Sequence, residues 1–128
     1  MDRRAAMGEA EGLRAAQARL EDGDPLGALE VLRRLGDALR FRAAGQLLLG
    51  RAYYHCAQLE RAQEALELSV ALDPRNPEAR FVLGRTLERR GRPREALKQL
   101  RIAAAVSGRA DYQRHVDALV ATLGSAAA

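Results

Sequence analysis

Tryptophan is absent from this 128-residue sequence, and three tyrosines and two phenylalanines are its aromatic residues. With so few rings, a core has to be built from alanine and leucine, which favours closely packed helices. No run alternates β-branched and polar residues, so strands are not indicated. A single cysteine, Cys56, excludes an internal disulfide. No segment approaches the ~20 consecutive apolar residues that a membrane-spanning helix needs.

Motifs that carry chemistry are also missing. The sequence contains no glycine-rich phosphate loop and no nucleophile-elbow motif. His55 and Cys56 are adjacent, so on a helix their side chains diverge by ~100° and form a poor nucleophile–base pair. His115 has no cysteine or carboxylate at a spacing that indicates zinc. We therefore expect no enzyme activity, no metal site and no cofactor.

The sequence has one lysine, Lys98, and 20 arginines. Its net charge is +4. This bias, with abundant alanine, is typical of a GC-rich bacterial genome, and the charge raises the chance of an acidic partner. The stretch from Met1 to Glu9 contains no apolar signal core. We expect a soluble cytoplasmic protein.

What the sequence does contain is an internal period of 34 residues. Small or leucine residues recur at this spacing, as in Gly23, Ala57 and Gly91, in Ala28, Ala62 and Ala96, in Leu32, Leu66 and Leu100, and in Gly50 and Gly84. A fixed period of this length indicates that one helical hairpin is used several times. Glycine inside a helix costs ~1 kcal/mol relative to alanine, so its return at one register indicates close helix packing.

Helix start and stop signals divide the chain into seven expected helices. Asp24-Pro25 and Asn76-Pro77 each place a capping side chain before a proline at the first helical position, and Pro93 opens another helix. The expected helices span about residues 3–21, 25–36, 41–57, 59–72, 77–90, 93–106 and 111–123. The turns are short, so neighbouring helices have to be antiparallel.

This pattern resembles the tetratricopeptide repeat family, whose repeats are helical hairpins with small residues at their crossing points. The second repeat carries most of the resemblance, with Leu49, Gly50, Tyr53, Ala62, Leu66 and Pro74 at family positions. The third matches at Leu83, Gly84, Ala96 and Ala103. The first is degenerate, because Arg19 stands at a usually aromatic position and Arg40 replaces the closing proline.

The resemblance implies an all-α fold, a right-handed α-solenoid in one domain of residues 1–128. Its three hairpins would cover about residues 9–42, 43–76 and 77–110, and a capping helix would follow over about 111–123. The apolar stripe of that last helix, formed by Tyr112, Val116, Leu119, Val120 and Leu123, would cover the sixth helix. The alternative for this helix is a partial fourth repeat that serves as an oligomer contact.

The resemblance also implies a concave groove lined by the first helix of each hairpin, which binds another protein or a peptide. The matching positions are Leu13, Gln17, Leu47, Arg51, Tyr54, His55, Phe81, Arg85, Glu88 and Arg89. Their mixture of apolar, aromatic and arginine side chains favours an extended or helical peptide with acidic and apolar side chains. The alternative is that Leu47 and Phe81 pack on neighbouring helices while the arginines are only solvated.

One subgroup of the family clamps the C-terminal carboxylate of chaperones, but the corresponding positions here are Leu13, Gln17, Leu48, Glu78 and Val82. Almost none of these can donate to a carboxylate, so we do not expect chaperone-tail binding.

The sequence thus favours a non-catalytic adaptor or scaffold. A self-associating assembly module, acting through a solenoid end or the groove, is the first alternative. A weak nucleic-acid binder is the second; it would use two arginine-rich turns, around 33–42 and 89–94.

Overall fold

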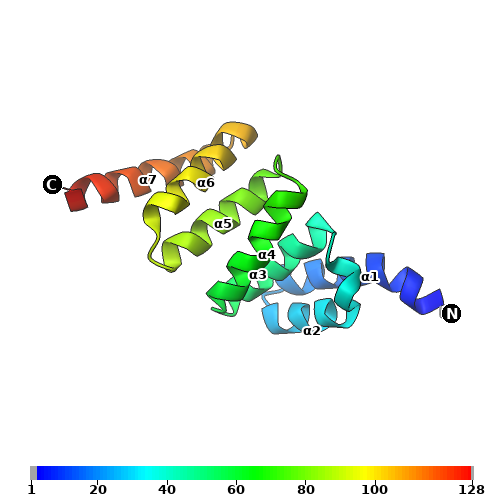
Figure 1. Cartoon of the computed structure of the whole chain (residues 1–128). Helices are drawn as coiled ribbons and strands as arrows, with labels where there is room; N and C mark the ends of the chain where they lie inside the picture. The colour runs from blue at the N-terminus through cyan, green and yellow to red at the C-terminus, as the bar shows by residue number, and fades with distance from the viewer. Residues whose placement is uncertain (1–2, 128) are drawn as a thin grey trace.

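A computed structural model describes residues 3–127 of the chain and the side chains of residues 8–125. Within this range the chain forms α-helices, one short 3-10 helix and no strand (Figure 1). The elements are α1 (Arg3–Glu21), α2 (Pro25–Leu35), η1 (Gly36–Leu39), α3 (Ala43–His55), α4 (Leu59–Leu72), α5 (Pro77–Arg89), α6 (Pro93–Ser107) and α7 (Ala110–Ala127). None of these helices is long and apolar enough to cross a membrane.

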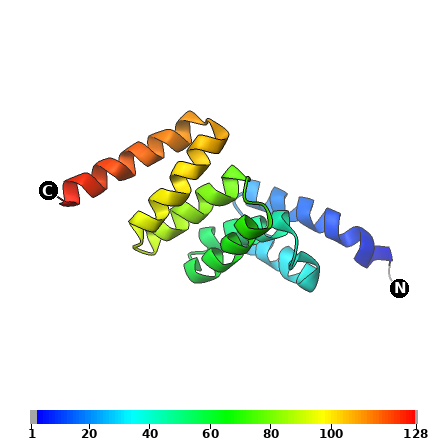
Figure 2. The same cartoon turned by 45° about the horizontal axis from the view of Figure 1, so that its top comes forward.

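The helices pair into three antiparallel hairpins, α1–α2, α3–α4 and α5–α6, which stack side by side with α7 at the far end (Figure 1). The second helix of each hairpin also packs on the first helix of the next element, as α2 does on α3 and α4 on α5. The two ends of the described chain therefore lie at opposite ends of an elongated stack, as the turned view also shows (Figure 2). This arrangement is the expected all-α solenoid.

The turn inside each hairpin is built around one residue with a positive φ. Gly23 and Gly91 have φ of +77°, and Ala57, at the equivalent position of the middle hairpin, has φ of +59°. Glycine adopts this region without a steric cost, whereas alanine does not. The turn position of the 34-residue period therefore requires a residue with positive φ. In the middle hairpin alanine adopts this conformation at a cost in conformational energy.

The small residues of the period lie where the two helices of a hairpin cross. A Cβ atom added to Gly50 would stand 2.4 Å from Cγ of Leu66, and one added to Gly84 would stand 2.6 Å from Cγ of Leu100. Both leucines are fully buried. Glycine at these sites lets the leucine of the facing helix pack directly against backbone, which is the close approach that the sequence predicted.

Two clusters of buried residues form the core. Leu29, Leu32 and Leu39 belong to the cluster of the first hairpin and α3. The larger cluster runs from α3 to α7 and includes Leu66 and Leu100. Tyr53 packs against both clusters, so α3 joins the first hairpin to the rest of the stack.

Helix α7 covers the last hairpin with Tyr112, Val116 and Leu119, which are buried, while Gln113, Arg114 and Asp117 face solvent. Val120, which was expected in the same apolar stripe, is instead 41% exposed. By the 34-residue register α7 occupies the place of the first helix of a further repeat. Asp117 stands where α3 and α5 carry Leu49 and Leu83, which makes this side of α7 compatible with water.

The connection between α2 and α3 departs from the expected helix over residues 41–57. Gly36, with φ of +53°, ends α2, and η1 follows before α3 begins at Ala43. Leu39 of η1 is buried, where it packs over Gly45, and its carbonyl accepts a hydrogen bond from Nε2 of Gln46 at 3.0 Å. Phe41 therefore lies outside α3 and is exposed.

Candidate functional site

The candidate site is the inner face of the stack, where the first helices of the hairpins, α1, α3 and α5, lie next to each other. Its centre is a hollow of about 180 Å³ between α3 and α5, here called the central hollow. The residues that line it are Arg51, Tyr54, His55, Phe81, Val82 and Arg85. Val82 and the two rings supply apolar surface, and the two arginines supply positive charge.

Arg51 connects the three inner helices. Its Nη1 donates to Oε1 of Gln17 on α1 at 3.4 Å and lies 3.9 Å from Oε1 of Glu78 on α5. The Arg51 side chain is 21% exposed. Because both contacts are at the long end of their range, the guanidinium has donors left for a stronger acceptor.

Further arginines on the inner face lie against aromatic rings. The guanidinium of Arg89 lies 4.8 Å from the ring centre of Tyr54, within cation–π range, and its Nη1 donates to the Tyr54 carbonyl at 3.2 Å. The guanidinium of Arg85 lies 6.0 Å from the ring centre of Phe81, and its Nε lies 3.8 Å from Oε1 of Glu88. Both guanidinium groups therefore lie within cation–π range of rings that line the hollow.

Burial and nearby positive charge both act on His55. Burial lowers the pKa of the His55 imidazole below its ordinary value of 6.5, and the charges of Arg51 and Arg89 lower it further. The imidazole is therefore neutral at pH 7. Its ring meets that of Tyr54 edge-on, with the centroids 5.3 Å apart.

The remaining predicted groove residues lie in different surroundings. Leu13 and Gln17 line a separate, shallow hollow of about 350 Å³ between α1 and α3. Leu47 is buried in the core, so it offers little surface to a partner. Phe81 is half-buried because its ring stacks on Tyr112 of α7, with centroids 4.0 Å apart and planes 6° apart. The three large apolar residues of the predicted groove, Leu13, Leu47 and Phe81, therefore form no continuous track, because Leu47 is buried between them.

Four residues that shape the inner face were not among the predicted groove residues. They are Val82 in the central hollow, Glu78 beside Arg51, and Tyr112 and His115 of α7. His115 Nε2 bonds to Oε1 of Glu88 and its ring meets Phe81 edge-on. The 34-residue register pairs position 81 with 115, so the same period could have placed His115 on this face.

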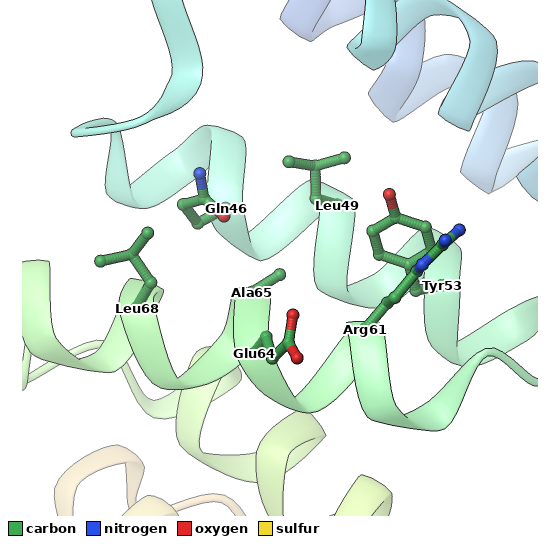
Figure 3. Close-up of a pocket in the computed structure, with 7 residues that line it drawn as sticks. All are labelled: Gln46, Leu49, Tyr53, Arg61, Glu64, Ala65 and Leu68. Carbon is green, nitrogen blue, oxygen red and sulfur yellow. The ribbon is translucent and has the colours of Figure 1, made fainter. Parts of the chain in front are cut away.

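A third hollow, of about 350 Å³, lies between α3 and α4, away from the inner face (Figure 3). It is lined by Gln46, Leu49, Tyr53, Arg61, Glu64, Ala65 and Leu68, which point from the two helices toward a common space (Figure 3). Its lining is mixed and its charged groups, Arg61 and Glu64, balance each other. Nothing in this lining selects one class of ligand.

The arginine-rich turns are partly engaged within the molecule. Arg34 pairs with Glu30 at 2.9 Å, Arg42 pairs with Glu9 at 2.8 Å, and Arg90 donates to Gln63 at 2.7 Å. Such contacts reduce the charge that these turns can offer to phosphates. Among the described residues there is no group of three or more metal-ligating side chains.

Residues 43–86 match the family model described as tetratricopeptide repeat. No curated protein matches the chain in sequence. Several solved structures share its fold. One is the first TPR of Spaghetti (RPAP3) bound to an HSP90 peptide. The superposition covers 97% of this chain and 96% of that one, with a TM-score of 0.80 and 15% sequence identity.

The Yersinia enterocolitica secretion chaperone SycD, in complex with a peptide of the translocator YopD, matches 91% of this chain over 89% of its own, with a TM-score of 0.73 and 17% identity. A mutant O-GlcNAc transferase from Thermobaculum terrenum matches 86% of this chain with a TM-score of 0.77 and 24% identity. This chain spans 21% of that enzyme's length. Residues 43–86 are therefore similar in sequence to the tetratricopeptide repeat, and the chain as a whole has the helical arrangement of these solenoids.

Proposed function

We propose that the chain is a non-catalytic adaptor that binds a peptide segment along its inner face. The fold supports protein interaction as the general function, because two proteins that share it are described in complex with an HSP90 peptide and with a YopD peptide. The central hollow carries the finer proposal. Its lining combines apolar surface from Val82 and the rings of Tyr54 and Phe81 with the guanidinium groups of Arg51 and Arg85. This chemistry suits a segment that places an acidic side chain beside an apolar one.

The electrostatics of the hollow support an anionic ligand. Arg51 and Arg85 line it and Arg89 lies over the ring of Tyr54, and the charges of Arg51 and Arg89 add to the effect of burial in lowering the pKa of His55. A carboxylate in the hollow would relieve this repulsion and would accept charge-assisted hydrogen bonds from the guanidinium groups.

The proposed client differs from a chaperone tail. The positions that would form a carboxylate clamp are Leu13, Gln17, Leu48, Glu78 and Val82, which carry no positive charge. Glu78 would instead repel a terminal carboxylate at this place. We propose an internal acidic–apolar segment as the ligand, and we place the adaptor in the cytoplasm, where its single cysteine needs no oxidising environment.

A display library of random peptides tests the proposal. The wild-type chain should enrich peptides with acidic residues next to leucine or aromatic residues. Arg51→Glu combined with Arg85→Glu should weaken the binding of an enriched peptide by about tenfold or more, measured by fluorescence anisotropy. The matched control is Arg33→Glu with Arg94→Glu, which changes the net charge equally at exposed sites outside the hollow.

Circular dichroism and thermal melting would first establish that both double variants fold. Enrichment of basic or uncharged peptides would contradict the proposed client. Equal loss of binding in the two double variants would show that net charge, and not the central hollow, controls the interaction.

A further inference from the structure

His55 is shared by two hollows of the molecule. It lines the central hollow, and it also lines a neighbouring hollow of about 280 Å³ at the turn of the first hairpin. The other residues that line this neighbouring hollow are Leu20, Gly23 and Pro25. None of these three carries a charge, so the ionised side chains that line a hollow together with His55 are those of Arg51 and Arg85.

The position of His55 in its helix favours a cation. His55 is the last residue of α3, and the 34-residue register pairs it with Glu21 and Arg89, the last residues of α1 and α5. Each hairpin thus ends its first helix with an ionisable side chain. The carbonyl groups at the C-terminal end of a helix carry partial negative charge, which stabilises a positive side chain there.

The surroundings of His55 in the free chain oppose protonation. Burial lowers the pKa of the imidazole most, and repulsion by the charges of Arg51 and Arg89 lowers it further. Even the ordinary value of 6.5 leaves an imidazole mostly neutral at pH 7. The free chain therefore holds an unprotonated base next to the arginines of its inner face.

The carboxylates on the α5 side of the hollow lie beside these arginines. Oε1 of Glu78 is 3.9 Å from Nη1 of Arg51, and Oε1 of Glu88 is 3.8 Å from Nε of Arg85. Neither carboxylate is among the groups that shift the pKa of His55. An acidic side chain that enters the central hollow would therefore bring a new negative charge to the imidazole.

We propose that His55 takes up a proton from the solvent when an acidic side chain of a bound segment enters the central hollow, and that the imidazolium then donates a hydrogen bond to that carboxylate. This step rests on the proposed function, since it needs an acidic segment on the inner face. Because binding favours the protonated chain, the protonated chain must in turn bind the segment more tightly. Affinity for acidic segments therefore rises as the pH falls below neutral.

Two effects of a bound segment compete at His55. The segment covers the imidazole and removes water, which favours the neutral form, whereas its carboxylate favours the charged form. An opposite charge within ~4–6 Å changes a pKa by about 1 to 3. His55 is exposed in the free chain and stands at a helix end, so a bound segment covers it only in part. We expect the carboxylate to prevail and the pKa of His55 to rise on binding.

Proton NMR titration of the imidazoles measures this rise directly. The probe is N-acetyl-aspartyl-leucine amide, and its asparaginyl counterpart is the matched neutral ligand. The chain has two histidines, so His115→Gln leaves a single imidazole signal and assigns it to His55. At saturation the acidic probe should raise the pKa of His55, and the neutral probe should not raise it.

Fluorescence anisotropy tests the same linkage through affinity, with an acidic peptide enriched by the display library. Its carboxylates stay ionised because their ordinary pKa is about 4. From about pH 8 to about pH 5.5 the wild-type chain should bind about fivefold more tightly or better. His55→Gln should lose this gain, whereas His55→Arg, which copies the residue at position 89, should bind tightly at both ends of the range.

His115→Gln is the discriminating variant, because His115 bonds to Glu88 on the same face and also titrates. It should keep the dependence on pH. A dependence that survives in His55→Gln or disappears in His115→Gln would overturn the proposal. Circular dichroism and melting temperature would establish that the variants fold, and the NMR titration needs no substitution at His55.

The two proposals can fail separately. Binding that needs Arg51 and Arg85 but is equally tight across the pH range would overturn proton uptake and leave the peptide site standing. A pKa of His55 that falls or stays constant when the acidic probe binds would do the same. If neither acidic probe binds to the chain, both proposals are wrong.

Discussion

Gly50→Ala tests the packing of the middle hairpin, because the usual effect of this substitution in a helix is reversed by a neighbour. In an open helix, alanine in place of glycine stabilises by ~1 kcal/mol. At Gly50 the added Cβ would lie 2.4 Å from Cγ and 2.5 Å from Cδ2 of Leu66, which is fully buried. Overpacking of this kind costs ~1–3 kcal/mol. We expect a net loss of about 1 kcal/mol in the free energy of unfolding, or ~4 °C in melting temperature.

Urea unfolding followed by circular dichroism measures this effect. Gly124→Ala is the matched control, since its Cβ would meet nothing within 4 Å and the substitution should be neutral or stabilising by up to ~1 kcal/mol. In the Gly50→Ala background, Leu66→Ala should cost less than in the wild type, because removing the leucine also removes the clash. If Gly50→Ala stabilises the chain as the control does, the crossing of α3 and α4 is wider than described and the explanation of the period is wrong.

Three further perturbations have defined outcomes. Ala57→Gly should raise the free energy of unfolding by about 1 kcal/mol in the same urea assay, because the equivalent turns already use glycine at positive φ; a loss of stability would contradict the strained turn. A backbone hydrogen bond and then an ion pair hold the pKa of Asp24 below its ordinary value of 3.8, so its stabilisation is complete above that value and is lost as pH falls through the lower folded pKa. Asp24→Asn should therefore flatten the decline of stability in acid, measured by urea unfolding at several pH values, and an unchanged decline would count against this contribution. Arg89→Gln should raise the pKa of His55 toward 6.5 without reaching it, because burial still lowers it; proton NMR titration measures this, and an unchanged pKa would show that Arg89 does not act on the hollow.

The architecture could be predicted from the sequence because each hairpin needs the same kinds of residue at equivalent positions. Gly50 and Gly84 stand at equivalent crossings and meet equivalent leucines, so a single packing rule accounts for both. The caps of α2 and α5 were also predicted from the sequence. The structure confirms them, because the Asp24 side chain accepts a hydrogen bond from Gly27 N and the Asn76 side chain accepts one from Glu78 N, each at 2.9 Å. These interactions join residues that are close in the sequence, and interactions of this kind can be predicted from the spacing of residues.

The end of the first hairpin could not be predicted in the same way. Gly36 ends α2 where the sequence predicted, but the chain then turns Leu39 into the core through η1, which leaves Phe41 outside α3. Arg40, which stands where the repeat usually has its closing proline, indicates that this connection departs from the family pattern. It does not indicate which backbone conformation the connection adopts. The shape of this connection depends on how Leu39 packs over Gly45 of the next helix.

The candidate site was predicted in part, for the same physical reason. Helix periodicity places Arg51, Tyr54 and His55 on one face of α3, and the structure brings them to one hollow with Phe81 and Arg85. Periodicity does not give the rotation of each helix against its neighbours. That rotation, a property of the whole stack, buries Leu47 in the core.

The stacked rings of Phe81 and Tyr112 link the hollow to the C-terminal helix. A ligand that turns the Phe81 ring has to break its stacking with Tyr112 and its edge contact with His115, both on α7. For such a ligand, binding and the docking of α7 would be coupled equilibria, and each would change the other by the same free energy. Truncating or tethering the last helix would then tune affinity at a distance, although α7 contributes no residue to the lining of the central hollow.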